Sequence, residues 1–184
     1  NPTLSPCGTK VAFTDKENNL CVWNAASGEV AKLTSDGTNV IMNGYASWVY
    51  YEEILGRSSR YKAFWWSPDS KRIAYYKFDD SSISMFPIYD SRGKHGFITE
   101  TRYPKAGDKN PEVKIAFVNI EDGSTVWADF DHTVDQYFGI PFWGPDSQEF
   151  FVARMPRLQN TIDLYAVNVA DGSKRHVYNE TYKT

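Results

Sequence analysis

The sequence predicts an all-β chain: a partial β-propeller of about three to four consecutive antiparallel blades with a short helical insertion. Three observations support this fold class. Aromatic residues make up 16% of the chain, a proline turn leading into a β-rich run occurs three times, and a strand ending in Asn-x-x-x-Gly also occurs three times. Aromatic side chains suit the pleated, half-buried surfaces of strands, and recurring phrases indicate a repeat architecture.

The first recurring phrase is the proline turn with its strand. Proline presets the backbone for a turn, Asp or Gly completes it, and a run of strand-forming residues follows. The three copies are Ser5-Pro6-Cys7-Gly8-Thr9-Lys10-Val11-Ala12-Phe13, Ser67-Pro68-Asp69-Ser70-Lys71-Arg72-Ile73-Ala74-Tyr75 and Gly144-Pro145-Asp146-Ser147-Gln148-Glu149-Phe150-Phe151-Val152.

The second phrase predicts a hairpin turn after a strand. Its copies start at Leu20, Ile115 and Leu164 and end at Gly28, Gly123 and Gly172. When two insertions, at about 41–64 and 79–111, are left out of the count, the phrases repeat about every 45 to 50 residues. This is close to the period of a four-stranded propeller blade. A β-sandwich with coincidental turns is the alternative fold.

This spacing predicts blade-like units at about 1–40, 64–130 and 131–184, with insertions at about 41–64 and 79–111. Three units are too few to close a ring of typically 4 to 8 blades. We therefore expect an arc of a larger propeller, and a chain that begins Asn1-Pro2-Thr3 is expected to be a piece of a longer protein.

Charge and composition argue against several functions. The net charge of −3 and the pI near 5.6 offer no basic stripe for nucleic acid, and the short apolar runs cannot span a membrane. Two cysteines without a histidine cluster cannot form a four-ligand zinc site, and we expect Cys7 and Cys21 to be free structural thiols, with a bridge as the alternative. No phosphate-binding or catalytic motif is present, so we expect no cofactor and no catalytic residue in this chain.

The first insertion contains two adjacent carboxylates. A short helix is predicted from Ser47, as N-cap, to Leu55, with Gly56 as its stop. Its apolar face is expected to comprise Trp48, Tyr51 and Leu55.

Glu52 and Glu53 would then point away from the blade, where two carboxylates could bind an ammonium group. The alternative is that they are solvated helix residues, with Arg57 forming a surface ion pair with Glu53 at i+4.

Three stretches together resemble the dipeptidyl peptidase IV family. They are Asn43-Gly44 with Trp48-Val49-Tyr50-Tyr51-Glu52-Glu53, then Phe64-Trp65-Trp66-Ser67-Pro68-Asp69, and finally Tyr103-Pro104-Lys105-Ala106-Gly107 with Asn110-Pro111-Glu112-Val113-Lys114. The resemblance covers most of residues 1–184 and is strongest over 43–118. Ser47 and Tyr51 depart from the family, which often has an aspartate and a further glutamate there.

The resemblance implies an N-terminal eight-bladed propeller joined to a C-terminal α/β-hydrolase domain that is absent from this chain. It implies a serine exopeptidase that releases dipeptides from substrates with penultimate proline or alanine. Glu52 and Glu53 correspond to the glutamates that bind the substrate's free N-terminus, so the chain would serve recognition and access and would be inactive alone. The family also implies an extracytoplasmic location.

The second insertion carries an apolar segment, Met85-Phe86-Pro87-Ile88-Tyr89, of the kind that often marks an interface. By resemblance, the 79–111 extension would contribute to a homodimer, whereas the alternative is an arm folded back onto its own blade. Two further functions remain open, a tripeptidyl relative of the same family and a non-enzymatic propeller that serves as a protein-interaction platform.

Overall fold

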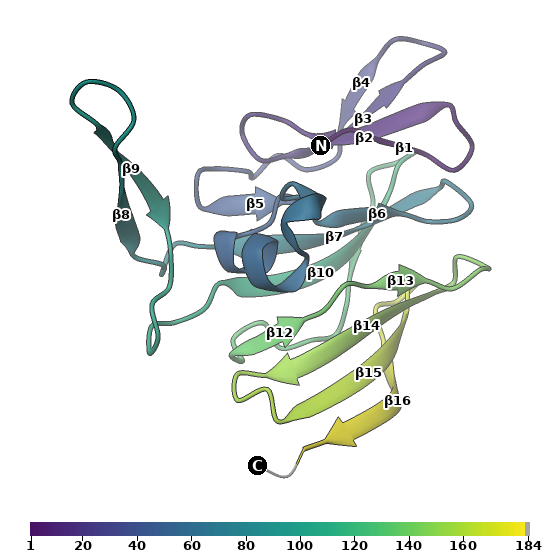
Figure 1. The fold of residues 1–184 in the computed structure, drawn as a ribbon. Coiled ribbons are helices and arrows are strands. Elements are labelled where there is room, and N and C mark those ends of the chain that lie inside the picture. Colours follow the sequence, from purple (N-terminus) through teal and green to yellow (C-terminus); the bar gives the residue numbers. More distant parts are fainter. Residues whose placement is uncertain (183–184) are drawn as a thin grey trace.

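The computed structural model describes residues 1–182, in which every strand pair is antiparallel and three blade-sized sheets follow one another along the chain (Figure 1). The partial propeller predicted from the sequence is confirmed. No helix in this part of the chain is long and apolar enough to cross a bilayer, and no group of three or more metal-ligating side chains gathers among residues 1–182.

The first sheet is a simple meander in the order β1-β2-β3-β4. Its strands are β1 (Thr3–Leu4), β2 (Lys10–Thr14), β3 (Leu20–Asn24) and β4 (Val30–Lys32). Both cysteines lie in or near it as free thiols, with Cys7 exposed and Cys21 buried.

The second sheet has the order β11-β10-β7-β5, with β6 also paired to β7. Its strands are β5 (Ile41–Asn43), β6 (Phe64–Trp66), β7 (Arg72–Asp79), β10 (Glu112–Asn119) and β11 (Thr125–Trp127). Because β5 pairs with one end of β7 and β6 with the other, the two form one edge strand that residues 44–63 interrupt. The first insertion therefore leaves the sheet after β5, slightly later than the expected start at about 41.

The third sheet repeats this arrangement in the order β12-β14-β15-β16, with β13 also paired to β14. Its strands are β12 (Gln136–Phe138), β13 (Phe142–Trp143), β14 (Glu149–Pro156), β15 (Thr161–Asn168) and β16 (Lys174–Thr181). Here only residues 139–141 interrupt the edge strand. The second sheet thus differs from the third by a long insertion at the equivalent position.

The middle sheet is buried on both faces, and side-chain alternation divides its residues between two cores. On β7, Ile73 and Tyr75 pack against the first sheet, whereas Tyr76 and Phe78 pack against the third. β10 alternates in the same way. The almost continuously apolar sequence of these strands therefore packs into two blade interfaces.

The proline turns also connect neighbouring sheets. The Cys7 N–H donates to Ser70 Oγ at 3.0 Å, and one repeat later the Asp69 N–H donates to Ser147 Oγ at 3.1 Å. A tryptophan indole before each later turn repeats the pattern. Trp66 Nε1 donates to the Thr3 carbonyl at 3.1 Å, and Trp143 Nε1 donates to the Trp65 carbonyl at 3.1 Å. The recurring phrases therefore encode contacts between blades as well as turns.

The second insertion forms a separate two-stranded hairpin, β8 (Met85–Asp90) and β9 (Phe97–Arg102), that projects from the blades (Figure 1). We call it the arm. Several of its apolar side chains are exposed, namely Met85, Ile88, Tyr89, Phe97 and Ile98.

Candidate functional site

The insertion between β5 and β6 holds a single π-helical turn, η1 (Tyr50–Ile54), followed by the short 3₁₀ turn η2 (Arg57–Ser59). The Leu55 N–H donates to the Tyr50 carbonyl at 2.7 Å, an i→i+5 bond, and Gly56 follows with a φ of 78°. Trp48 and Val49 are α-helical and lead into η1. The predicted helix is thus present over nearly the expected residues and stops at the expected glycine, but most of it is a wider π turn.

Ser47 lies at the predicted N-cap position, where its carbonyl accepts the Tyr51 N–H at 3.0 Å, but its side chain does not cap the helix. Its Oγ instead donates to Asp80 Oδ2 at 3.0 Å, and both residues are buried. Asp80 Oδ1 has no hydrogen-bond partner. Burial raises the pKa of the Asp80 carboxyl to about 6, partly opposed by the Ser47 hydrogen bond and the Arg102 charge.

The predicted apolar face of the insertion is right at Leu55 and in part at Tyr51, which packs against the core, but not at Trp48. Tyr50 is the fully buried residue, while Trp48 and Tyr51 are partly exposed. The cause is the π geometry, in which residues five apart share a face, so that Tyr50 and Leu55 point together into the core. Trp48 packs edge-on against Tyr103 at the base of the arm, with ring centroids 4.6 Å apart.

The two candidate glutamates are adjacent in η1 but lie in different environments. The Glu52 side chain is only 12% exposed and forms an ion pair with Arg57, whereas Glu53 is exposed. The predicted Glu53–Arg57 pair is therefore wrong: the helix ends before Gly56, whose φ of 78° redirects the chain, and Arg57 pairs with Glu52 from η2. The Glu52 carboxylate raises the pKa of the Arg57 guanidinium, so it already holds a cation.

A stack of three tyrosines supports the same segment. Tyr61 stacks on Tyr51 at 3.7 Å and on Tyr45 at 4.8 Å between ring centroids. Tyr61 has a φ of 67°, a left-handed conformation that is uncommon for a bulky residue and is held here by its surroundings. Burial raises the pKa of Tyr61 to about 12. Tyr51, one of the two departures from the family pattern, thus packs in this stack beside Glu52.

Sequence reasoning identified the glutamates but missed three residues that hold the insertion in place, Tyr50, Tyr61 and Asp80. The available signals were weak. Tyr50 lies five residues before Leu55, a spacing that marks one face only in a π turn, and Asp80 directly follows a long apolar strand.

Fold and site together define a class: an arc of a β-propeller whose edge strand is interrupted by a loop that presents acidic side chains. Comparison with known proteins identifies the family. The chain matches the dipeptidyl peptidase IV (DPP IV) N-terminal region over residues 1–184 and belongs to that family.

Similar proteins come from fungi and bacteria. A probable dipeptidyl-aminopeptidase B of Phaeosphaeria nodorum is 30% identical over 97% of this chain and 21% of its own length. A probable dipeptidyl peptidase 4 of Aspergillus flavus is 31% identical over 90% of this chain and 22% of its own. The crystal structure of Porphyromonas gingivalis dipeptidyl peptidase 4 superposes with a TM-score of 0.86 at 27% identity, over 100% of this chain and 26% of that one. The chain therefore spans about a quarter or less of these relatives.

Proposed function

We propose that this chain is the substrate-recognition and gating part of a dipeptidyl peptidase IV-type serine exopeptidase, which releases N-terminal dipeptides with penultimate proline or alanine. Glu52 and Glu53 bind the substrate's N-terminal ammonium. The catalytic serine, aspartate and histidine lie in a C-terminal α/β-hydrolase domain of the full-length protein, so residues 1–184 alone are inactive. Support comes from family membership and from the much greater length of the relatives.

One observation carries this proposal: the Glu52 carboxylate, on a loop anchored to the blades, is paired with a guanidinium. An α-ammonium group offers the same charge and hydrogen-bond donors. The substrate's ammonium group can replace the Arg57 guanidinium. Because the Arg57 side chain is exposed, it can move into water at little cost in free energy. Glu53, which no hydrogen bond or ion pair engages within residues 1–182, supplies a second carboxylate.

The test is carboxylate removal in the full-length protein. Hydrogen bonds to charged groups contribute about 1.5–3 kcal/mol each, and about 1.4 kcal/mol corresponds to one decade. Glu52→Gln and Glu53→Gln should therefore each lower kcat/KM at least about tenfold for a chromogenic dipeptide substrate with a free N-terminus. Labelling of the active-site serine by a small phosphonylating reagent should stay unchanged.

Glu121→Gln is the matched control, since Glu121 is an exposed carboxylate on a hairpin turn of the middle blade. It should leave both the kinetics and the labelling unchanged. Unaltered peptidase kinetics in both Glu52→Gln and Glu53→Gln would contradict the proposed ammonium site.

The arm is proposed to take part in a homodimer of the full-length protein. Its exposed apolar side chains support this role, because isolated hairpins rarely leave so many uncovered. Sedimentation of the full-length protein tests it: Ile98→Lys should shift the protein toward monomer, and an unchanged sedimentation coefficient would contradict it.

A further inference from the structure

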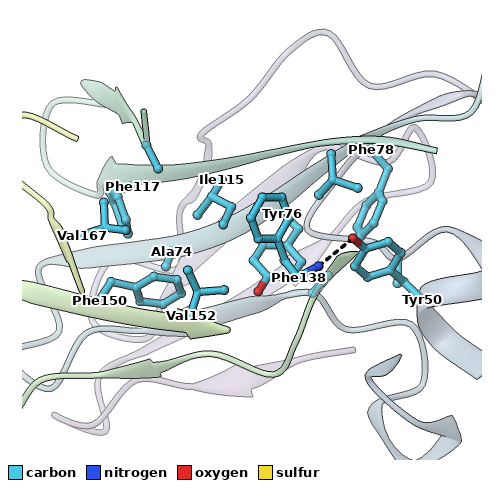
Figure 2. Close-up of a cluster of buried hydrophobic side chains, with 14 of the residues drawn as sticks. Tyr50, Ala74, Tyr76, Phe78, Ile115, Phe117, Phe138, Phe150, Val152 and Val167 are labelled. Carbon is cyan, nitrogen blue, oxygen red and sulfur yellow. Dashed lines mark hydrogen bonds between the residues drawn. The ribbon is translucent and has the colours of Figure 1, made fainter. Parts of the chain in front are cut away.

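Tyr50 lies at the start of η1, two residues before Glu52, and its side chain points into the core between the second and third blades (Figure 2). It is fully buried. Its ring packs edge-on against Phe78, with centroids 4.9 Å apart, and against Tyr76, with centroids 6.3 Å apart. Tyr50 is thus the largest fully buried side chain that the insertion contributes to this core.

The phenol oxygen of Tyr50 makes a specific contact inside this core. The Phe138 N–H donates to Tyr50 Oη at 3.0 Å, as the dashed line in Figure 2 shows. Phe138 is the last residue of β12, where the edge strand of the third blade breaks. The interruption of one blade's edge strand is therefore tied to the interruption of the next.

A single helical turn has little stability of its own, because fixing its dihedral angles costs more than one hydrogen bond returns. The orientation of η1 must therefore come from contacts outside it. Leu55 supplies packing, and the Ser47 hydroxyl fixes the residue just before the helical segment to Asp80. Within η1 itself, the Tyr50 hydroxyl supplies a bond with a defined length and direction. We expect that removing that bond lets the turn rotate and moves the two glutamates with it.

We infer that Tyr50 is a positioning residue for the ammonium site, which it serves by fixing η1 to the backbone of the third blade through its buried hydroxyl. This inference rests on the proposed function of Glu52 and Glu53. Tyr50 itself does not touch the substrate, so its removal should weaken substrate binding without altering the reacting groups.

Tyr76 offers a matched control within the same core. It is also fully buried, and its hydroxyl donates to the Gly139 carbonyl at 2.7 Å, one residue beyond Phe138. Tyr76 lies on β7, however, and not in the insertion. Tyr50→Phe and Tyr76→Phe therefore remove the same atom from the same blade junction, but only Tyr50→Phe releases η1.

The experiment measures KM and kcat of the full-length protein with a chromogenic dipeptide substrate. Tyr50→Phe should raise KM about fivefold, equivalent to about 1 kcal/mol at 1.4 kcal/mol per decade, with kcat little changed. Tyr76→Phe should lower the melting temperature about as much as Tyr50→Phe does, while leaving KM unchanged. Equal KM changes in the two variants, or none in Tyr50→Phe, would overturn the inference.

Two further measurements separate this inference from the proposed function. Hydrogen exchange of the Leu55 amide, which closes η1, should become faster in Tyr50→Phe than in Tyr76→Phe. Equal exchange rates would overturn the anchoring role whatever the kinetics show. Faster exchange together with unaltered kinetics in both Glu52→Gln and Glu53→Gln would instead overturn the ammonium site, and the positioning role with it, while leaving Tyr50 as a structural anchor.

Discussion

Replacing Asp80 with asparagine removes a carboxylate that the fold buries without satisfying it. Asp80 Oδ2 accepts the Ser47 hydroxyl, and Oδ1 has no partner. Arg102 and Asp79 are the charged groups that act on it, with opposite signs, and burial raises its pKa to about 6. Asparagine keeps the shape and can still accept the Ser47 hydrogen bond, but it carries no charge.

The sign of the effect follows from linkage. Because the pKa of Asp80 is higher in the folded state than the roughly 3.9 of an unfolded aspartate, the folded protein binds the proton more tightly. The resulting stability is fully present below about pH 4 and is lost as the pH rises through about 6. A difference of about 2 pKa units at 1.36 kcal/mol each gives about 3 kcal/mol.

Asp80→Asn should therefore be more stable than the wild type by up to about 3 kcal/mol at pH 8, and by almost nothing at pH 4. For a chain of this length, 1 kcal/mol shifts the melting temperature by about 2–4 °C, so the expected gain at pH 8 is up to about 6–12 °C.

Thermal melts of both proteins across this pH range measure it. Ser47→Ala, which removes the hydrogen bond that lowers the pKa of Asp80, should move the midpoint of the wild-type pH dependence upward. A stability difference that stays constant with pH, or a loss of stability at pH 8, would refute the burial reasoning.

Two other features give testable expectations. The hydroxyls of Ser5 and Thr9 lower the pKa of the exposed Cys7 thiol to about 6, whereas burial raises the pKa of Cys21 to about 11. At pH 7 iodoacetamide should alkylate Cys7 and spare Cys21 until the chain is unfolded, and mass spectrometry showing equal rates would contradict this. Trp143→Phe removes the indole donor to the Trp65 carbonyl between two blades. It should lower the free energy of unfolding by about 1–3 kcal/mol in urea titrations, and an unchanged midpoint would mean that this bond adds nothing.

The blades could be predicted from the sequence because their signals are short-range. Gly8, Ser70 and Ser147 occupy the same place in the three proline turns and share a left-handed φ of 76°, 61° and 62°. Gly28, Gly123 and Gly172 likewise close the three hairpins on Asn24, Asn119 and Asn168. Each turn is specified by four or five consecutive residues, so local chemistry is enough to place it.

The candidate site was only partly predictable. The family motif located Glu52 and Glu53, but helical periodicity gave the wrong role for the Ser47 side chain, an apolar face that is only partly right and the wrong partner for Arg57. The errors have separate causes. The Ser47 hydroxyl bonds Asp80, and the π turn brings Tyr50 into the core with Leu55. Gly56 ends the helix before Arg57.

The sequence by itself therefore determined the all-β class, the blade phrases and the acidic pair, all of which depend on neighbouring residues. Only the tertiary structure decided how the acidic pair is held. Tyr50 and Phe138 are 88 positions apart, and Trp65 and Trp143 are 78 apart. Such contacts exist only after the blades have packed, because the partner of each buried polar group is chosen by the neighbouring sheet and not by the adjacent sequence.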